Sequence, residues 1–524
     1  MAAGEGEFYF PEPIIQRIQS FLDGKEAART AIISKSWHSA WLTRPNLDFD
    51  ETYFFRRSVD PYQHRHVPIG DFNKYAKKTI KRYEQSNLKI ESFNLCMQID
   101  QYGRPALANK LIVKALKIGA TRLCLRLSRK NSFVLPIEVF GADNLVELSV
   151  SGCTIDLDEG VVIKCQRLES LSLDVGVDIN FDTVCKLISS CTSIENLSLS
   201  GWRFDAAASR ATAVGVVDKL IPRLRCLVLS YESFKILCLG DLLSRFPFLK
   251  DFTLFLHHTT DIILEEGIQI SNSSLERIKF VQQYFERRPR NRKRKLGFKF
   301  DVPSARKLTI ECNVIPTLSF MSTPLSREWE SHVSIQFEER KFNGLSTIWF
   351  SELSQLLTEL SQSKTHLSLK VGWNKWSFDY NVGDKIIQGL RKHDLENLTI
   401  DMTGVPTLGC YALFDGLFRL CRPKLITQYY EDDPHQEQRY NGQNIDFLCQ
   451  ILEKGIKLEV PDPTQFMYGL NDLEEMNVQA YDVDNVPAEW KPISLDSLDT
   501  DAPDEHKDAQ AKQRIRLLLK WKHS

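Results

Sequence analysis

The 524-residue sequence lacks the features that mark several large classes of protein. Its formal net charge is only −1, which argues against a broad electrostatic surface for nucleic acid or an acidic membrane. No uninterrupted apolar run approaches the roughly 18 residues that a membrane helix needs. The N-terminal segment has neither the basic nor the apolar stretch of a secretory signal. We therefore expect a folded protein of the nucleus or the cytoplasm, with no membrane and no nucleic acid among its partners.

Signatures of catalysis and of metal binding are missing as well. The twelve cysteines are scattered singly and no CxxC pair occurs, which favours reduced, buried thiols over disulfides or a zinc site. Neither of the glycine-rich phosphate motifs, GxGxxG and GxxxxGK followed by Ser or Thr, is present, and no GxSxG nucleophile elbow occurs. We expect no metal, no cofactor and no catalysis by this chain itself.

The segment from residue 10 to residue 51 is rich in apolar side chains. Pro11 fixes its start, and Ile14, Ile15 and Ile18 begin a helical stripe. Trp37 and Trp41, four residues apart, share one face of a later helix. Three short helices within about 40 residues enclose little interior, so such a unit usually needs a partner. The segment is therefore either a cap over the rest of the chain or a surface for another protein.

The same residues resemble the F-box. The similarity covers Phe10-Pro11-Glu12, Ile18, Ser20-Phe21-Leu22, Ala28-Arg29-Thr30, Ser34-Lys35, Trp37 and Trp41 at fixed spacing. The resemblance implies docking on a Skp-type adaptor and, through it, on a cullin. By the resemblance, the adaptor-binding candidates are Phe10, Pro11, Ile14, Ile15, Ile18, Trp37 and Trp41. Phe10 departs from the family, which usually has Leu there.

The middle of the chain repeats. Segments such as "NLVELSVSGCTI", "RLESLSLDVGV" and "SIENLSLSGWRF" share an apolar–x–x–apolar–x–apolar core. The first apolar positions of successive copies are Ile90, Ala120, Leu145, Leu168, Ile194, Leu224, Leu249, Leu275 and Ala305, with further copies at Lys364 and Leu395. The spacing of the first nine matches a leucine-rich repeat of about 20–29 residues, with some longer copies. Each copy predicts one short strand with inward apolar residues, such as Leu148, Leu171, Leu197, Leu227 and Leu308.

These patterns predict an α/β protein in which a three-helix F-box is followed by a curved leucine-rich-repeat solenoid. The predicted organisation is an adaptor-binding module over 1–50, a connector and capping helix over 51–88, the solenoid over 89–426, and a C-terminal cap with a partly mobile tail over 427–524. The longer repeats leave room for helices at 181–191 and 349–362 on the side away from the strands.

Side chains that alternate with the inward leucines must point out of the opposite face of the sheet. These are the candidates for substrate binding: Glu147, Ser149, Ser172, Asp174, Ser198, Lys279, Lys307 and Lys370. The face changes along the chain from small, polar and partly acidic to more basic. It is either a groove that binds a protein or a solvated strand surface without a ligand.

A dense basic run spans residues 287–295. Such a run is typical of a nuclear import signal, for which the candidates are Arg292, Lys293, Arg294 and Lys295. An inert surface loop between two repeats and an anion-binding or nucleic-acid-binding segment remain the alternatives.

The resemblance implies a substrate receptor of an SCF-type ubiquitin ligase, in which the F-box holds the adaptor and the repeats hold an unidentified target protein. Two other functions stay open. One is a protein-binding scaffold outside any ligase. The other is a small-molecule co-receptor, because some plant F-box solenoids sense hormones above an inositol phosphate; against it, the basic residues here are concentrated in one run.

Overall fold

The structure is a computed structural model of the whole chain. It describes residues 10–54, 69–99, 104–127, 133–157, 160–174, 177, 179, 181–199, 223–230, 239–244, 246–257, 267–283, 296–322, 324, 329–337, 347–371, 391–401, 407–428, 448, 452, 470, 472–482, 490–492 and 513–522. The chain divides into two compact units. The first comprises Met1–Cys238 and Arg245–Lys250, and the second Leu239–Ser244 and Asp251–Ser524.

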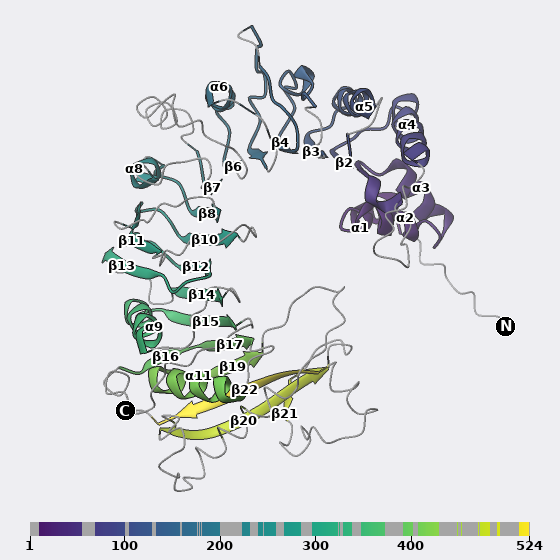
Figure 1. Cartoon of the computed structure of the whole chain (residues 1–524). Coiled ribbons are helices and arrows are strands. Elements are labelled where there is room, and N and C mark those ends of the chain that lie inside the picture. The colour runs from purple at the N-terminus through teal and green to yellow at the C-terminus, as the bar shows by residue number, and fades with distance from the viewer. Residues whose placement is uncertain are drawn as a thin grey trace, which may run out of the picture. The chain divides into compact units, whose positions relative to one another are not determined.

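Three short helices open the first unit (purple in Figure 1). They are α1 (Glu12–Gln19), α2 (Gly24–Thr30) and α3 (Lys35–Thr43). A side-chain oxygen caps each of the last two, because Asp23 accepts from the Glu26 amide at 2.7 Å and Ser34 accepts from the Trp37 amide at 3.3 Å. The predicted three-helix module is thus confirmed.

Seven parallel strands form the ladder of the first unit, each paired with the next along the chain (Figure 1). They are β1 (Asn46–Asp50), β2 (Ser92–Met97), β3 (Arg122–Leu127), β4 (Glu147–Ser151), β5 (Ser170–Leu173), β6 (Asn196–Leu199) and β7 (Cys226–Ser230). One inward row consists of Leu47, Phe93, Leu123, Leu148, Leu171, Leu197 and Leu227, all buried and in register. The predicted inward leucines of this unit are therefore confirmed.

Helices cover the side of this ladder to which its buried row of residues points (Figure 1). The helical elements after the first three helices are η1 (Glu51–Phe54), α4 (Ile69–Gln85), α5 (Arg104–Ile118), η2 (Ile137–Val139) and α6 (Phe181–Ser190). Helix α4 buries Phe72, Ala76, Ile80 and Tyr83 along one side and contacts η1 and α5. The capping helix predicted within residues 51–88 and the helix predicted at 181–191 are both present.

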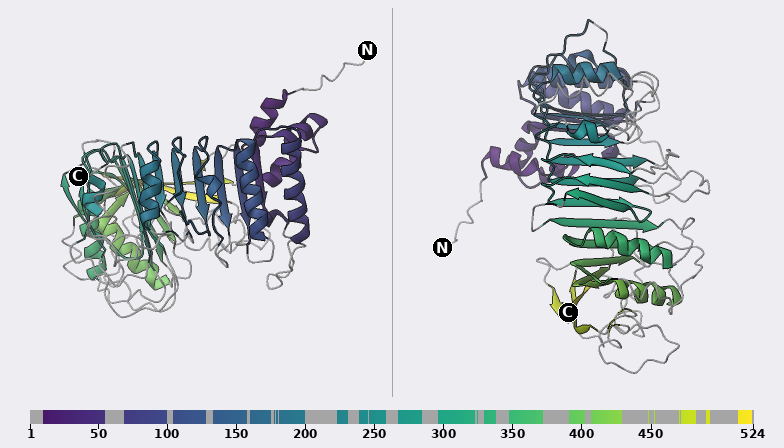
Figure 2. Two further views of the ribbon diagram at one scale, coloured as in Figure 1. Left: turned by 90° about the horizontal axis from the view of Figure 1, so that it is seen from above. Right: turned by 90° about the vertical axis from the view of Figure 1, so that its left-hand side faces the viewer.

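A second parallel ladder runs through the second unit, and its strands lie one above another in the right-hand view of Figure 2. It contains β8 (Asp251–His257), β10 (Arg277–Gln283), β12 (Lys307–Cys312), β14 (Glu330–Phe337), β15 (Lys364–Val371), β17 (Asn397–Asp401) and β19 (Leu425–Gln428). Leu308 is buried, as predicted, but Ser331 and Thr365 follow it in the same inward row. Strand β14 was not predicted.

The other side of the second ladder carries both helices and strands. The helices are α8 (Leu239–Ser244), α9 (Thr347–Glu359) and α11 (Thr407–Leu420), and α9 matches the prediction at 349–362. A small parallel sheet of β9 (Ile268–Ser271), β11 (Gly297–Asp301) and β13 (Thr317–Ser322) contacts α8 and α9, and β16 (His393–Leu395) pairs with β18 (Cys421–Pro423). Neither sheet was predicted.

The C-terminal elements extend the second ladder in the antiparallel sense. They are β20 (Leu473–Asp482), β21 (Lys491–Pro492) and β22 (Gln513–Trp521), and β22 pairs with both β19 and β20. Asp472, just before β20, accepts hydrogen bonds from Lys392 at 2.9 Å and from Arg422 at 2.7 Å. Because β22 pairs with β19, the last strand covers the edge of β19 that would otherwise be open. None of the helices that the structure describes is long and apolar enough to cross a membrane.

Candidate functional site

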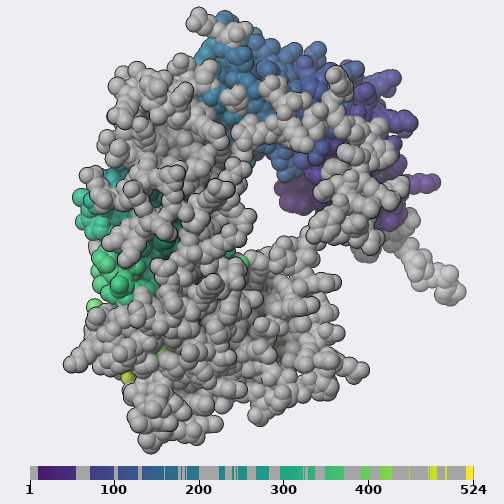
Figure 3. Space-filling model, viewed as in Figure 1, coloured from purple at the N-terminus to yellow at the C-terminus, as the bar shows by residue number. Residues whose placement is uncertain are grey.

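Exposed apolar side chains are concentrated in the N-terminal helices and the turns that join them. Within the described part of the chain, six of the twelve exposed large apolar side chains lie between residues 10 and 33. They are Phe10, Ile14, Ile18, Phe21, Ile32 and Ile33, with exposed fractions from 38% for Ile18 to 89% for Ile32. We call these six residues the N-terminal apolar set. Purple atoms of this segment reach the surface in the space-filling view (Figure 3). A patch of exposed apolar side chains is typical of a surface that binds another protein.

Helix α1 presents two different faces. Ile14 and Ile18 lie four residues apart on the exposed face. Ile15 and Gln19, on the opposite face, are fully buried. Among the predicted adaptor contacts, Ile14 and Ile18 are therefore accessible in the free chain, whereas Ile15 belongs to the module's own interior.

The remaining adaptor candidates differ in exposure. Phe10 and Pro11 are exposed, and Trp37 and Trp41 are half-buried. Gln19 links α1 to the other helices, because its Nε2 donates to Thr30 Oγ1 at 2.9 Å and to the Trp37 carbonyl at 3.2 Å. The exposed face of α1 is thus held in place by polar contacts on its buried face.

Asp48, in strand β1, connects the three helices to the repeats. Its Oδ2 accepts from the Gly24 amide at 2.9 Å and from the Tyr53 hydroxyl at 2.8 Å, while its Oδ1 accepts from Asn94 Nδ2 at 2.7 Å. The pKa of Tyr53 is raised, first by burial and then by this hydrogen bond. Gly24 stands where a Cβ would lie 2.7 Å from Asp48 Oδ2. The start of α2 can approach β1 this closely only because residue 24 has no side chain.

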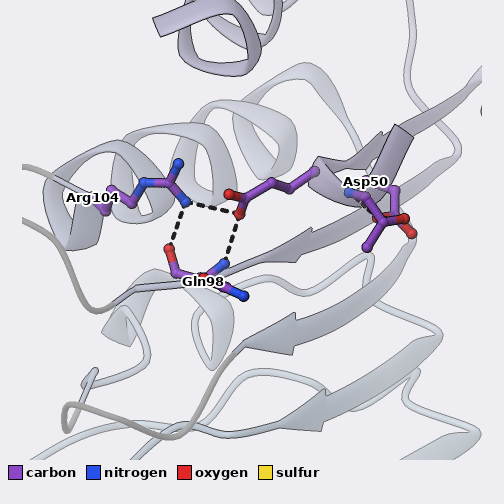
Figure 4. Close-up of polar contacts among 5 residues, drawn as sticks. Asp50, Gln98 and Arg104 are labelled. Carbon is purple, nitrogen blue, oxygen red and sulfur yellow. Dashed lines mark hydrogen bonds and ion pairs between the residues drawn. The ribbon is translucent and has the colours of Figure 1, made fainter. Parts of the chain in front are cut away.

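A buried ion pair lies beside this connection. Arg104 Nη1 donates to Glu51 Oε2 at 2.8 Å and to the Gln98 carbonyl at 2.8 Å, and the Gln98 amide donates to the same Glu51 oxygen (Figure 4). The Arg104 and Glu51 side chains are 2% and 10% exposed. Asp50 lies apart from this group in the same view. The pair ties η1 to α5 and to the end of β2.

The substrate-binding candidates of the first unit share one face of its ladder. Ser149, Ser172 and Ser198 are register partners on β4, β5 and β6, and each is half-buried. Glu147 occupies the neighbouring row and is also half-buried, and Asp174 follows β5 and is exposed. We call the side of each ladder that carries these outward residues its strand face. In the first unit this face is small, polar and accessible.

Two thiols on the same strand face, those of Cys96 and Cys124, are expected to be unreactive. Burial, with a further contribution from Asp50, raises the pKa of Cys96 to about 11. Burial also raises the pKa of Cys124. Both thiols are therefore protonated at neutral pH and are poor nucleophiles. In the described residues, no three His, Cys, Asp or Glu side chains converge to form a site for a metal ion.

The candidates of the second unit lie on its strand face in different environments. Lys279 forms an ion pair with Glu311 at 2.7 Å. Lys307 is exposed, and Lys370 is half-buried. The import candidates Arg292, Lys293, Arg294 and Lys295 lie outside the residues that the structure describes.

Comparison with known proteins gives relatives in plants, although no protein-family model matches the sequence. F-box/LRR-repeat protein At3g59190 of Arabidopsis thaliana is 29% identical over 200 residues, which cover 37% of this chain and 50% of that protein. The putative F-box/LRR-repeat protein At3g59230 of the same plant is 26% identical over 204 residues, or 37% of this chain and 40% of that protein. The chain is similar to the F-box/LRR-repeat proteins of plants. It spans half or less of the length of these two relatives.

A putative FBD-associated F-box protein of Arabidopsis thaliana, At5g22720, is similar at 28% identity over 203 residues, covering 37% of this chain and 39% of that protein. Among solved structures, an LRR protein of Leptospira interrogans shares 14% sequence identity and covers 72% of this chain and 95% of that chain. Its TM-score of 0.25 is too low to establish a common fold. The F-box/LRR-repeat similarity therefore rests on the plant sequences.

Two features of this chain escaped the sequence interpretation. The alternation in "NLDFD" is a strand signal, and it could have placed Asp48 between the buried Leu47 and Phe49. The apolar pattern extends the second helix to Ile32 and Ile33, but α2 ends at Thr30 and both residues lie in the turn that follows it. The spacing also does not show which side of so small a unit faces the solvent. The structure gives that side directly.

Proposed function

We propose that this chain is the substrate-recognition subunit of an SCF-type cullin–RING ubiquitin ligase. The observation that carries the proposal is the N-terminal apolar set on a folded three-helix module in a chain similar to plant F-box/LRR-repeat proteins. The module binds a Skp-type adaptor, and the strand faces bind a target protein. The chain contributes position rather than bond chemistry, because it raises the effective concentration of the target near the ubiquitin-loaded enzyme.

The first test is capture of a Skp-type adaptor by the full chain and by an Ile14→Asp/Ile18→Asp variant. Both side chains are exposed, so the variant should retain the thermal unfolding transition of the wild type. An interface hot spot contributes about 2 kcal/mol or more, which corresponds to roughly thirtyfold in affinity. We expect wild-type capture and loss of capture in the variant.

The matched control is Val162→Asp, which places the same charge at another exposed apolar position of the first unit. This variant should capture the adaptor as well as the wild type does. Failure of the wild-type chain to capture any Skp-type adaptor would refute the ligase proposal. The chain would then be a protein-binding scaffold outside a ligase.

We also propose that the basic run directs the chain to the nucleus, with a cytoplasmic fraction. A fluorescent fusion carrying alanine at Arg292, Lys293, Arg294 and Lys295 should move out of the nucleus and still capture the adaptor. An unchanged distribution would exclude the run as an import signal.

A further inference from the structure

Two histidine side chains stack on the strand face of the second unit. His332 of β14 and His366 of β15 are register partners. Their rings are parallel within 3°, and their centroids lie 4.3 Å apart. Both side chains are half-buried. Two imidazolium ions at this separation would repel each other strongly, so the free protein disfavours the state in which both rings are protonated.

The charged groups around the pair come from four strands. On β14, Glu330 Oε2 lies 3.3 Å from His332 Nε2. Strand β12 contributes Lys307, and Glu396, just before β17, also acts on His366. On β15 itself, Lys364 and Lys370 lie on the same face as His366. The pKa of His366 is lowered, first by burial and then by His332; Glu330 and Glu396 oppose this shift and Lys307 adds to it.

These groups leave an excess of positive charge for an incoming ligand. Lys307 and Lys364 are the register partners of Glu330 on either side, and neither has an ion-pair partner among the described residues. Glu330 is already in contact with His332, and Glu396 accepts from Lys424 at 2.6 Å. An added carboxylate would therefore meet two unpaired ammonium groups and two imidazoles, each able to donate a hydrogen bond.

We propose that the stacked His332–His366 pair, with Lys307 and Lys364, binds a carboxylate of an acidic segment of the target protein, and that this binding strengthens as the pH falls. The proposal rests on the proposed function, in which the strand faces bind the target. A carboxylate beside the rings offsets their mutual repulsion, so the second proton is taken up on binding. Because binding and proton uptake are linked, acidification from neutral pH increases the affinity.

The direct test uses an acidic peptide as the probe. A fluorescent, end-blocked twelve-residue peptide of alternating Glu and Gly or Ser is titrated with the full chain at pH 7.5 and at pH 6.0, at constant ionic strength. We expect binding about fourfold tighter at pH 6.0, as for one imidazole whose pKa rises by about one unit on binding. A peptide with Gln in place of every Glu should bind weakly at both pH values.

Three variants separate the contributions. The double variant His332→Gln/His366→Gln should remove most of the pH dependence, because no imidazole remains in the pair to take up a proton. Lys307→Gln should weaken binding at both pH values and retain their ratio. The matched control, His38→Gln, removes an exposed histidine of the N-terminal module and should leave both affinities unchanged. Circular dichroism confirms that each variant is folded.

Three outcomes overturn the proposal. They are equal peptide affinity at the two pH values, unaltered pH dependence in His332→Gln/His366→Gln, and preference for a short RNA of the same charge over the peptide. Adaptor capture is measured on the same preparations. Peptide binding without adaptor capture would support this inference and refute the ligase role. Adaptor capture without pH-dependent peptide binding would support the ligase role and refute this inference.

Discussion

The buried pair of Arg104 and Glu51 allows a quantitative test of the connection between the N-terminal module and the repeats. Glu51→Gln retains an oxygen that can accept from the Gln98 amide, but it removes the negative charge beside a guanidinium that is 2% exposed. Arg104 Nε and Nη2 are buried and have no hydrogen-bond partner among the described residues. The remaining charge would therefore be uncompensated, which costs about 3–5 kcal/mol of unfolding free energy.

The assay is urea denaturation of the full chain, followed by circular dichroism. A Glu51→Gln/Arg104→Met variant removes both charges and should recover most of the loss, because no isolated charge remains buried. The matched control is Glu84→Gln at the exposed pair with Lys114, where little change in stability is expected. If Glu51→Gln costs no more than Glu84→Gln, Arg104 is solvated and the reasoning fails.

Three further predictions concern single positions. Leu148→Ala should lower the free energy of unfolding by about 2–5 kcal/mol, whereas Ser149→Ala on the strand face should change it little; urea denaturation compares the two. Gly24→Ala should cost about 1–3 kcal/mol in the same assay, since its Cβ meets Asp48; an unchanged midpoint would contradict the close approach. Asp472→Asn should destabilise the second unit near neutral pH. The hydrogen bonds from two cations lower the pKa of Asp472, so the wild-type advantage should vanish as the pH falls below about 4 and through the folded-state value.

The sequence pattern predicted a strand where leucine fills the middle inward position. Strand β14 has Ser331 in this inward row, as β15 has Thr365, and it was not recognised as a copy of the repeat. The structure satisfies this serine with hydroxyl groups, because its Oγ lies 2.7 Å from Ser363 Oγ and donates to Thr365 Oγ1 at 3.1 Å. A polar inward position is tolerated when a neighbouring repeat supplies its partner. Such pairing joins residues more than thirty positions apart and leaves no local signal.

The small sheet of β9, β11 and β13 was missed for a different reason. Its strands lie in the long connections between repeats, where about 20 residues accommodate a helix or a strand equally well. The alternation of Phe298 and Phe300 fits a strand, and both rings pack into an aromatic core with Phe280. Whether such a segment becomes helix or strand depends on the segments beside it.

The sequence predicted which residues of α1 form the candidate adaptor-binding site, but not which of their side chains face the solvent. The F-box resemblance selected Ile14, Ile15 and Ile18 together, because they form one apolar stripe. The structure divides the stripe, since Ile15 packs inward and the other two face the solvent. In a module of three short helices, one turn of helix has apolar neighbours on both sides, and periodicity does not distinguish them.

Strand β1 has a practical consequence for deletion experiments. It pairs along its five residues with β2, so a protein that begins at residue 51 would lose this partner and expose the backbone N–H and C=O groups of β2 as an open edge. Open edges of this kind promote self-association. A truncated protein that failed in a degradation assay could thus fail through aggregation, with its adaptor contacts never examined. Substitution of Ile14 and Ile18 leaves the edge covered and isolates the effect of the binding surface.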